Sequence, residues 1–214
     1  LGHAASKGFG GCALGQAAGV IVCHNFSVER RQIVAEADGL AGVGVLGVGE
    51  QRRVEDALVI GIQRGEFTFY LQPKCNSLTG NIVSMEALVR WHHPEMGLVS
   101  PSRFIPLLEE TGLVTDLDRY IWESVCRTMS GWIRGGKHFV PISVNVSITD
   151  MKAMDVPAHF REMVRRYDLK SELIRVEITE TAFAENSNLV REAIDRLHQY
   201  GSVSYTHLRA HETC

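Results

Sequence analysis

The sequence has no paired cysteines, no long apolar run and no cluster of basic residues. Its five cysteines are odd in number and form no C-x-x-C pair, which argues against a disulfide framework or a zinc ribbon and favours a reducing, cytoplasmic compartment. The mildly apolar stretch from Gly11 to Cys23 is too short to cross a bilayer and lacks the basic flank of a signal peptide. A net charge of −3 argues against a nucleic-acid polymer as partner.

The chain does contain enough apolar sequence for one large or two small domains. Residues 1–51 are rich in glycine and alanine and carry no motif, so we assign them to a linker or to part of an upstream domain. From residue 52 onward, hydrophobic periodicity becomes regular. Because the chain begins with Leu1, we expect the sequence to start inside a longer protein.

Strands and helices alternate along the regular part of the chain. We expect strands over Phe67–Gln72, where Pro73 follows, and over Val83–Trp91, Ile142–Ser147 and Leu173–Glu180. We expect helices from Arg52 to Gly65, from Pro101 to Gly112, and over Asp116–Arg134, Pro157–Tyr167 and Leu189–Tyr200. Strands that alternate with crossover helices predict an α/β fold with a mainly parallel sheet, whose apolar face packs on the helices.

The strand from Val83 to Trp91 carries two charges on one face. Alternate residues of a strand point the same way, so Glu86, Leu88 and Arg90 share one side of it. Burying a charge is costly unless it is paired or bound to a ligand. This strand is therefore a candidate for a functional site, with a structural ion pair or a solvated face as the alternative.

The other three strands each add a polar residue in the equivalent position, namely Gln72, Asn145 and Glu177. At the mouth of an α/β barrel, Glu86, Asn145 and Glu177 would offer two carboxylates and an amide oxygen, which suit magnesium or manganese. Such a metal would leave Arg90 to pair with a phosphate. Each residue also has a structural alternative: Asn145 could satisfy backbone groups, Glu177 could pair with a neighbour, and Gln72 could simply end its strand.

Two pairs of histidines are weaker candidates for metal ligands. His92 and His93 are adjacent at a strand end, where neighbouring side chains diverge, so a polar loop is the better interpretation. His207 and His211 have helical spacing, but nothing predicts a helix there.

Taken together, the strands resemble the EAL-domain phosphodiesterases, which hydrolyse the bacterial messenger cyclic di-GMP. Glu86-Ala87-Leu88 is the naming motif, and the resemblance covers about residues 52–204. The full set of matching segments is Tyr70-Leu71-Gln72-Pro73, Met85–Trp91, His93-Pro94, Phe104-Ile105-Pro106, Ser143–Ser147 and Glu177-Ile178-Thr179-Glu180.

The resemblance implies a TIM-like (β/α) barrel, incomplete here with about its first four strands, and metal-assisted attack of water on one phosphodiester bond to give linear pGpG. By this resemblance, Glu86, Asn145 and Glu177 would be catalytic residues that bind Mg²⁺ or Mn²⁺. Gln72, Leu88 and Arg90 would contact the dinucleotide, and Glu180 would stabilise a neighbouring loop. The implied partners are cyclic di-GMP, a second copy of the domain, and an upstream GGDEF or sensory domain. The implied location is the cytoplasm. The parent protein could still be anchored to the membrane through a segment that precedes this sequence.

The sequence departs from the family pattern after Ser204. The family continues with a strand bearing paired aspartates, then a lysine, a glutamate and a glutamine, whereas residues 205–214 read YTHLRAHETC. We therefore expect residues 205–214 to be foreign sequence and the chain as it stands to be inactive. Two main hypotheses follow for the parent protein: a cyclic di-GMP phosphodiesterase, or an inactive EAL domain that acts as a cyclic di-GMP receptor or interaction module. The intact motifs favour the enzyme.

Overall fold

The computed structural model describes residues 21–23, 57, 59–178 and 180–206. The strands are β1 (Ile21–Cys23), β2 (Phe67–Cys75), β3 (Ile82–His93), β4 (Gly97–Val99), β5 (Ile142–Val146), β6 (Ile174–Ile178) and β7 (Val203–Thr206). The helices are α2 (Pro101–Thr111), α3 (Val114–Arg134), α4 (Ile148–Ala153), α5 (Val156–Arg166), α6 (Glu180–Glu185) and α7 (Ser187–Gln199), with a 3₁₀ turn at Ser171–Leu173 and helical residues 59–64 before β2. Most of the proposed linker and the tail from residue 207 lie outside the described residues.

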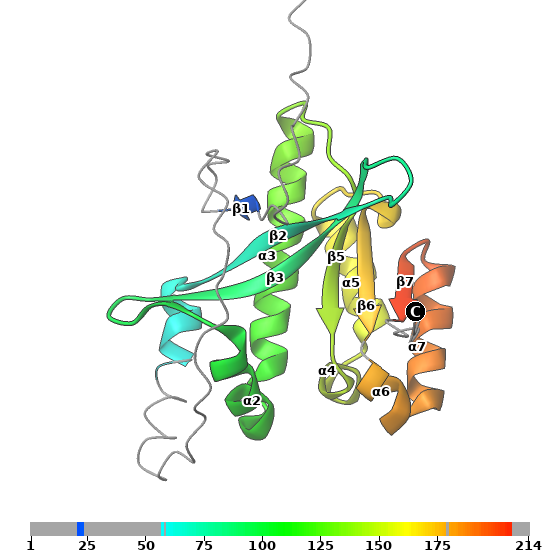
Figure 1. The fold of residues 1–214 in the computed structure, drawn as a ribbon. Coiled ribbons are helices and arrows are strands. Elements are labelled where there is room, and N and C mark those ends of the chain that lie inside the picture. The colour runs from blue at the N-terminus through cyan, green and yellow to red at the C-terminus, as the bar shows by residue number, and fades with distance from the viewer. Residues whose placement is uncertain (1–20, 24–56, 58, 179, 207–214) are drawn as a thin grey trace, which may run out of the picture.

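The described strands form one sheet in the order β1-β2-β3-β5-β6-β7, with β4 paired to β3 (Figure 1). The pairs β3–β5, β5–β6 and β6–β7 are parallel, as the alternation of strands and helices predicts. The pairs β1–β2, β2–β3 and β3–β4 are antiparallel. The connection between β2 and β3 is a short turn, and only antiparallel strands can be joined so closely.

The β2–β3 hairpin turns at Asn76, whose side-chain Oδ1 accepts hydrogen bonds from the backbone N–H groups of Leu78 and Thr79. The expectation that β2 ends before Pro73 is wrong, because the strand continues to Cys75. Beyond Leu71, β2 has only β3 as a described neighbour, and proline is tolerated in a strand with an open edge.

The predicted helices begin and end within two residues of their expected bounds wherever those bounds are described. Gly112 ends α2 in the left-handed region at φ 74°, which glycine adopts without strain. Side chains of Asp155 and Asn186 cap α5 and α7 by accepting backbone N–H groups of their first turns. The short helices α4 and α6 were not predicted. The Ser147/Asp150 capping box that begins α4 was a usable signal for it.

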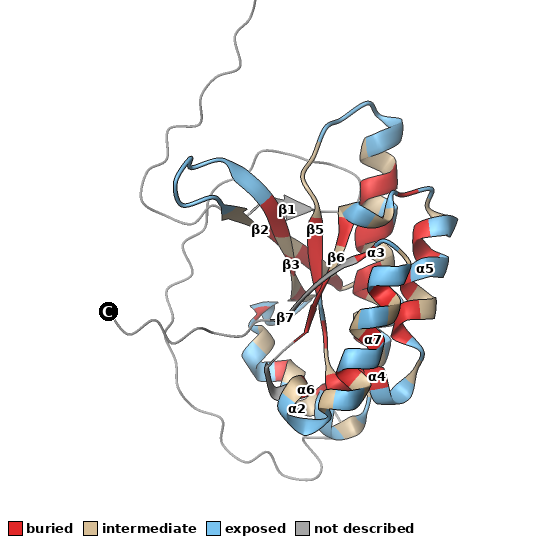
Figure 2. Ribbon diagram, turned by 90° about the vertical axis from the view of Figure 1, so that its right-hand side faces the viewer, coloured by how far each residue is buried: buried red, intermediate tan, exposed pale blue. Residues whose placement is uncertain are grey.

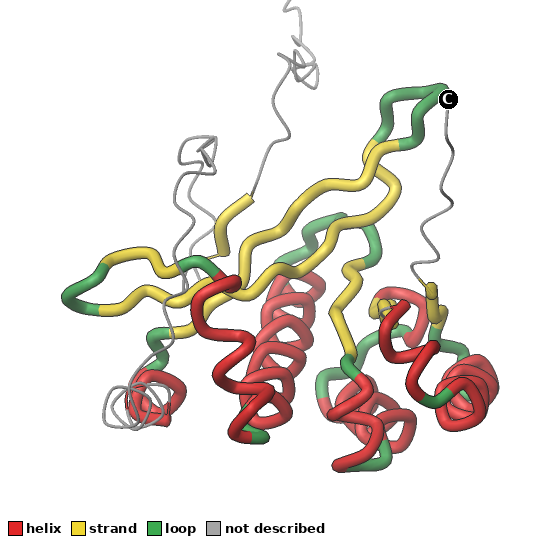
Figure 3. The backbone as a smooth tube through the Cα atoms, turned by 60° about the horizontal axis from the view of Figure 1, so that its bottom comes forward, coloured by secondary structure: helices red, strands yellow, loops and turns green. Residues whose placement is uncertain are grey.

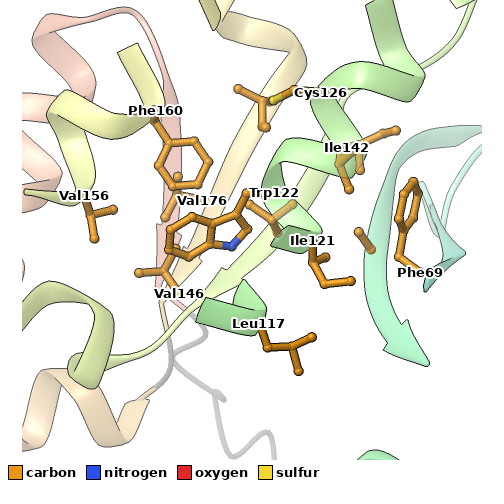
Figure 4. Packing of buried hydrophobic residues seen from close by; sticks show 14 of the residues in the cluster. Phe69, Leu117, Ile121, Trp122, Cys126, Ile142, Val146, Val156, Phe160 and Val176 are labelled. Carbon is orange, nitrogen blue, oxygen red and sulfur yellow. The ribbon is translucent and has the colours of Figure 1, made fainter. Parts of the chain in front are cut away.

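The helices cover one face of the sheet (Figures 2 and 3). The hydrophobic core lies between the helices and this face of the sheet. In it, Trp122 of α3 lies beside Val146 of β5 and packs on Phe160 of α5 (Figure 4). Strands β2, β5 and β6 supply alternate apolar residues to this core, so the residues between them point to the opposite face of the sheet. None of the described helices combines the length and apolar character needed to cross a bilayer.

Candidate functional site

The sheet face opposite the helices carries a set of polar side chains from β2, β3, β5 and β6, which we call the polar face. In the strand register, Gln72 lies opposite Glu86, and Asn145 lies opposite Glu177. The structure therefore brings the sequence-predicted residues of four strands to one face. By the alternation of each strand, the polar face includes Tyr70, Gln72, Lys74, Glu86, Arg90, Ser143, Asn145, Arg175 and Glu177, together with the apolar Leu88. Thr68, Ser84 and His92 share the same alternation.

Glu86 and Asn145 are in direct contact on this face. The Asn145 side-chain Nδ2 donates a hydrogen bond of 3.2 Å to Glu86 Oε1. The register between β3 and β5 pairs Glu86 with Ser143 and ends one pair later, at Ala87 and Val144. Asn145 thus lies just past the paired segment, where its side chain reaches the carboxylate on the neighbouring strand.

Lys74 joins Glu86 to Glu177. Its ammonium group lies 3.2 Å from Glu86 Oε2 and donates a hydrogen bond to Glu177 Oε1. The Glu177 side chain is only 4% exposed, and a carboxylate so deeply buried needs a cation or donors to offset its lost hydration. Burial lowers the Lys74 pKa, but the hydrogen bond and charge of Glu177, together with those of Glu86, outweigh it and raise the pKa above its ordinary value.

Sequence reasoning missed Lys74 because it ended the strand at Pro73. With β2 extended to Cys75, the alternation Tyr70, Gln72, Lys74 puts the lysine on the polar face. The signal was therefore present in the sequence. Pro73 made the strand appear to end too early, because proline is normally found where a strand ends or lacks a neighbour, and β2 has no described β1 partner beyond Leu71.

Arg90 lies farther along β3 and is nearly buried. It is 8% exposed, its Nη1 donates to the backbone oxygen of Val89, and its guanidinium carbon lies 5.2 Å from the centre of the Tyr70 ring. Leu88 is the register partner of Tyr70. Arg90 lies four positions beyond Glu86, roughly 13 Å along an extended strand. The polar face therefore has a carboxylate end and an arginine end.

Asn145 is also fixed from the helix side of the sheet. The Trp122 indole Nε1 donates a hydrogen bond of 3.0 Å to the backbone oxygen of Asn145. Trp122 is 1% exposed, and it packs on Phe160 with ring centres 4.9 Å apart. This contact could not be predicted from the sequence, because nothing in the helical stripe of α3 indicates which carbonyl an indole will reach.

The remaining sequence candidates are dispersed. The expectation that His92 and His93 lie in a polar loop is wrong, because they are the last two residues of β3. His93 Nδ1 accepts hydrogen bonds from the backbone N–H groups of Glu95 and Met96 in the turn that follows the strand. His92 Nε2 lies 3.5 Å from the Tyr70 hydroxyl. The Glu180 side chain, like His207 and His211, falls outside what the structure describes, so its loop-stabilising role stays a prediction.

The residues present fit a hard divalent cation in part. Glu86, Asn145 and Glu177 offer oxygen donors, and the Lys74 ammonium between the two carboxylates shows that this position accommodates positive charge. Water or a substrate phosphate would supply the remaining positions of Mg²⁺, which takes six ligands and usually keeps several waters. Within the described residues, no cluster of three His, Cys, Asp or Glu side chains could hold a metal ion by itself.

Comparison with known proteins identifies the family. The family model described as "EAL domain" matches residues 51–203. The chain belongs to the EAL domain family. Among curated relatives, it is 28% identical over 152 residues to the bifunctional diguanylate cyclase/cyclic di-GMP phosphodiesterase MucR of Pseudomonas aeruginosa, covering 71% of this chain and 22% of MucR. It is 30% identical over 154 residues to the oxygen sensor protein DosP of Escherichia coli, covering 69% of this chain and 19% of DosP.

Solved EAL domains have the same fold. The structure named "PaMucR Phosphodiesterase, c-di-GMP complex" matches with a TM-score of 0.67 and 27% identity, over 71% of this chain and 62% of that one. The FimX EAL domain from Pseudomonas aeruginosa bound to c-di-GMP matches with a TM-score of 0.64 and 18% identity, over 72% and 61%, and supports the fold alone. The predicted α/β fold of the EAL type, a TIM-like barrel, is thereby confirmed. The chain spans only about a fifth of the two curated relatives.

Proposed function

We propose that the EAL domain to which this chain belongs hydrolyses cyclic di-GMP to linear pGpG in bacterial second-messenger signalling. The observation that carries the proposal is the convergence of Glu86, Asn145 and Glu177 around one cationic position on the polar face. Two further facts support it. The chain belongs to the EAL family, and Pseudomonas aeruginosa proteins named as cyclic di-GMP phosphodiesterases are among its relatives.

In this proposal Glu86, Asn145 and Glu177 hold Mg²⁺ or Mn²⁺. The bound cation would polarise the phosphate and lower the pKa of the attacking water. Since Asn145 Nδ2 donates to Glu86, the amide is oriented with its Oδ1 available as a ligand. The Trp122 indole holds the same residue through its backbone oxygen.

The arginine end of the polar face would bind the dinucleotide. Arg90 presents a planar guanidinium, which suits a phosphate, and the Tyr70 ring beside it limits its orientation. Gln72 and Leu88 lie on the same face and would contact the rest of the ligand. The separation of the two ends along β3 matches a ligand larger than a single phosphate.

The proposal includes the domain limits and the state of the chain. We assign residues 52–204 to the EAL domain, residues 1–51 to a linker or upstream segment, and residues 205–214 to foreign sequence. We expect a full-length cytoplasmic protein with a GGDEF or sensory domain, able to pair through its EAL domain. We expect negligible turnover from the 214-residue chain, because residues 205–214 do not carry the paired aspartates with which the family pattern continues.

The test is to measure binding and hydrolysis separately. Binding of fluorescently labelled cyclic di-GMP is titrated in the presence of Mn²⁺, and formation of pGpG is followed by chromatography. We expect the chain to bind the nucleotide without measurable turnover, and Arg90→Met to weaken binding about tenfold through the loss of charged hydrogen bonds. Glu162→Gln, which removes an exposed carboxylate on α5, is the matched control and should change nothing.

Each outcome distinguishes one part of the proposal. Turnover that Glu86→Gln abolishes would confirm the reaction and contradict the inactivity of the chain. Binding without turnover, in a full-length protein as well, would identify the parent as a receptor. A chain that folds but does not bind cyclic di-GMP contradicts the proposed function.

A further inference from the structure

Lys74 is the one basic residue that the structure shows between the two proposed glutamate ligands. It comes from β2, whereas Glu86 and Glu177 come from β3 and β6, so three strands bring these charges together. The ammonium group contacts Glu86 Oε2 and Glu177 Oε1. A cation that bridged the two carboxylates through these same oxygens would need the position that Lys74 occupies.

Two carboxylates facing one site repel each other unless a positive charge lies between them. Lys74 supplies that charge within the chain itself. It therefore keeps Glu86 and Glu177 together when no metal is bound, and it lowers the free energy that a metal gains by neutralising them. These two effects have opposite consequences: the first prepares the site, and the second weakens metal binding.

We propose that Lys74 is a resident counter-ion of the site, and that a divalent cation enters only by displacing its ammonium group from Glu86 and Glu177. The inference rests on the proposed function for the identity of the metal ligands. Displacement is feasible because the Lys74 side chain is 32% exposed and lies one residue from the end of β2. A flexible four-carbon stem lets the ammonium move into solvent, where it is strongly hydrated.

The experiment measures Mn²⁺ binding in the absence of nucleotide. The electron paramagnetic resonance signal of free aqueous Mn²⁺ disappears on binding, so its titration gives the affinity without any turnover. The wild-type chain is compared with Lys74→Met, which removes the charge but keeps the length, and with Lys74→Arg, which keeps the charge. Lys152→Met, which breaks an exposed ion pair with Glu185 on the helix side, is the matched control.

We expect Lys74→Met to bind Mn²⁺ about tenfold more tightly than wild type. In this variant the metal no longer competes with the ion pairs that Lys74 makes with Glu86 and Glu177. Lys74→Arg should stay within about threefold of wild type, and Lys152→Met should be unchanged. Without metal, Lys74→Met should melt at a lower temperature than wild type, since two carboxylates lose their partner, and Mn²⁺ should raise its melting temperature by more. Circular dichroism checks folding, and Lys74→Gln replaces Lys74→Met if the latter does not fold.

Equal or weaker Mn²⁺ binding by Lys74→Met would overturn the proposal, as would the absence of Mn²⁺ binding by both proteins. Loss of the tight binding in the double variant Lys74→Met/Glu86→Gln would support it by assigning the metal to this site. Failure of the proposed function has a different signature. If Lys74→Met binds Mn²⁺ tightly but neither protein binds cyclic di-GMP, the counter-ion role stands and the substrate is wrong.

Discussion

Asn145 is held on both sides of the sheet, and one of its two restraints comes from Trp122, a residue outside the polar face. Its backbone oxygen accepts the Trp122 indole hydrogen bond, and its side chain donates to Glu86. The β3–β5 register ends at Val144, so this oxygen lies just past the paired segment. A buried carbonyl without a partner is costly. The single hydrogen bond from Trp122 therefore has two effects: it stabilises the end of β5, and it positions Asn145, a proposed metal ligand.

Trp122→Phe should destabilise the chain by about 2 kcal/mol, since it leaves the Asn145 carbonyl without its indole donor and opens a small cavity beside Phe160. Urea denaturation followed by circular dichroism measures the change. Trp132→Phe is the matched control. Trp132 is only partly buried and packs on Phe139, so its loss should cost less than about 1 kcal/mol. Equal costs for the two variants would contradict a specific role for the Trp122 hydrogen bond.

At the scale of elements, the contact between α3 and α4 brings two acidic residues together. Burial, and next the neighbouring Asp150 carboxylate, raise the pKa of Asp118 well above its ordinary value. The Asp150 carboxylate itself is engaged in the capping box, where it accepts the backbone N–H and hydroxyl of Ser147. Asp118 therefore has a physical reason to stay protonated in the folded state.

This arrangement predicts a pH-dependent stability. Because the folded-state pKa of Asp118 is raised, its stabilising effect is complete below the unfolded value near 3.8 and is lost as the pH rises through the folded value. Asp118→Asn, which mimics the neutral acid, should match wild type near pH 4 and be more stable by on the order of 1 kcal/mol above the raised pKa. Denaturant titrations across this range test it.

The control for Asp118 is Asp116 on the same helix. Asp116 is exposed and lies 3.9 Å from Arg119, so Asp116→Asn should change the free energy of unfolding by less than about 0.5 kcal/mol at any pH in the range. If Asp118→Asn were less stable than wild type at neutral pH, the carboxylate would be contributing as an ion, and the buried-acid interpretation would be wrong.

At the scale of the whole molecule, the two faces of the sheet differ in how firmly they are supported. Helices pack on one face and bury the apolar residues of β5 and β6 almost completely (Figure 2). The tip of the β2–β3 hairpin extends beyond these layers (Figure 1), and Leu78 there is 93% exposed. Local stability follows the density of buried contacts. The strands that present Asn145 and Glu177 therefore belong to the most stable part of the described chain.

Hydrogen exchange followed by mass spectrometry should reproduce this difference. Amides of residues 142–144 and 175–178 are expected to exchange only through global unfolding, because these parts of β5 and β6 are paired on two sides and covered by helices. Amides at 77–80, in the hairpin turn, should exchange several orders of magnitude faster. Comparable protection in the turn and in β5 would contradict this view and would indicate that a partner covers the hairpin.

The sequence by itself determined the family, the order of the longer strands and helices, and the face on which most of the polar residues lie, because these depend on local periodicity and on motifs such as Glu86-Ala87-Leu88. Only the tertiary structure decided which of those residues touch. Lys74 contacts both Glu86 and Glu177, and Glu177 is 103 residues away from it in sequence. The hydrogen bond from the Trp122 indole to the Asn145 backbone oxygen depends on where α3 packs against the sheet. Such contacts are set by three-dimensional register and packing, which no single segment of sequence encodes.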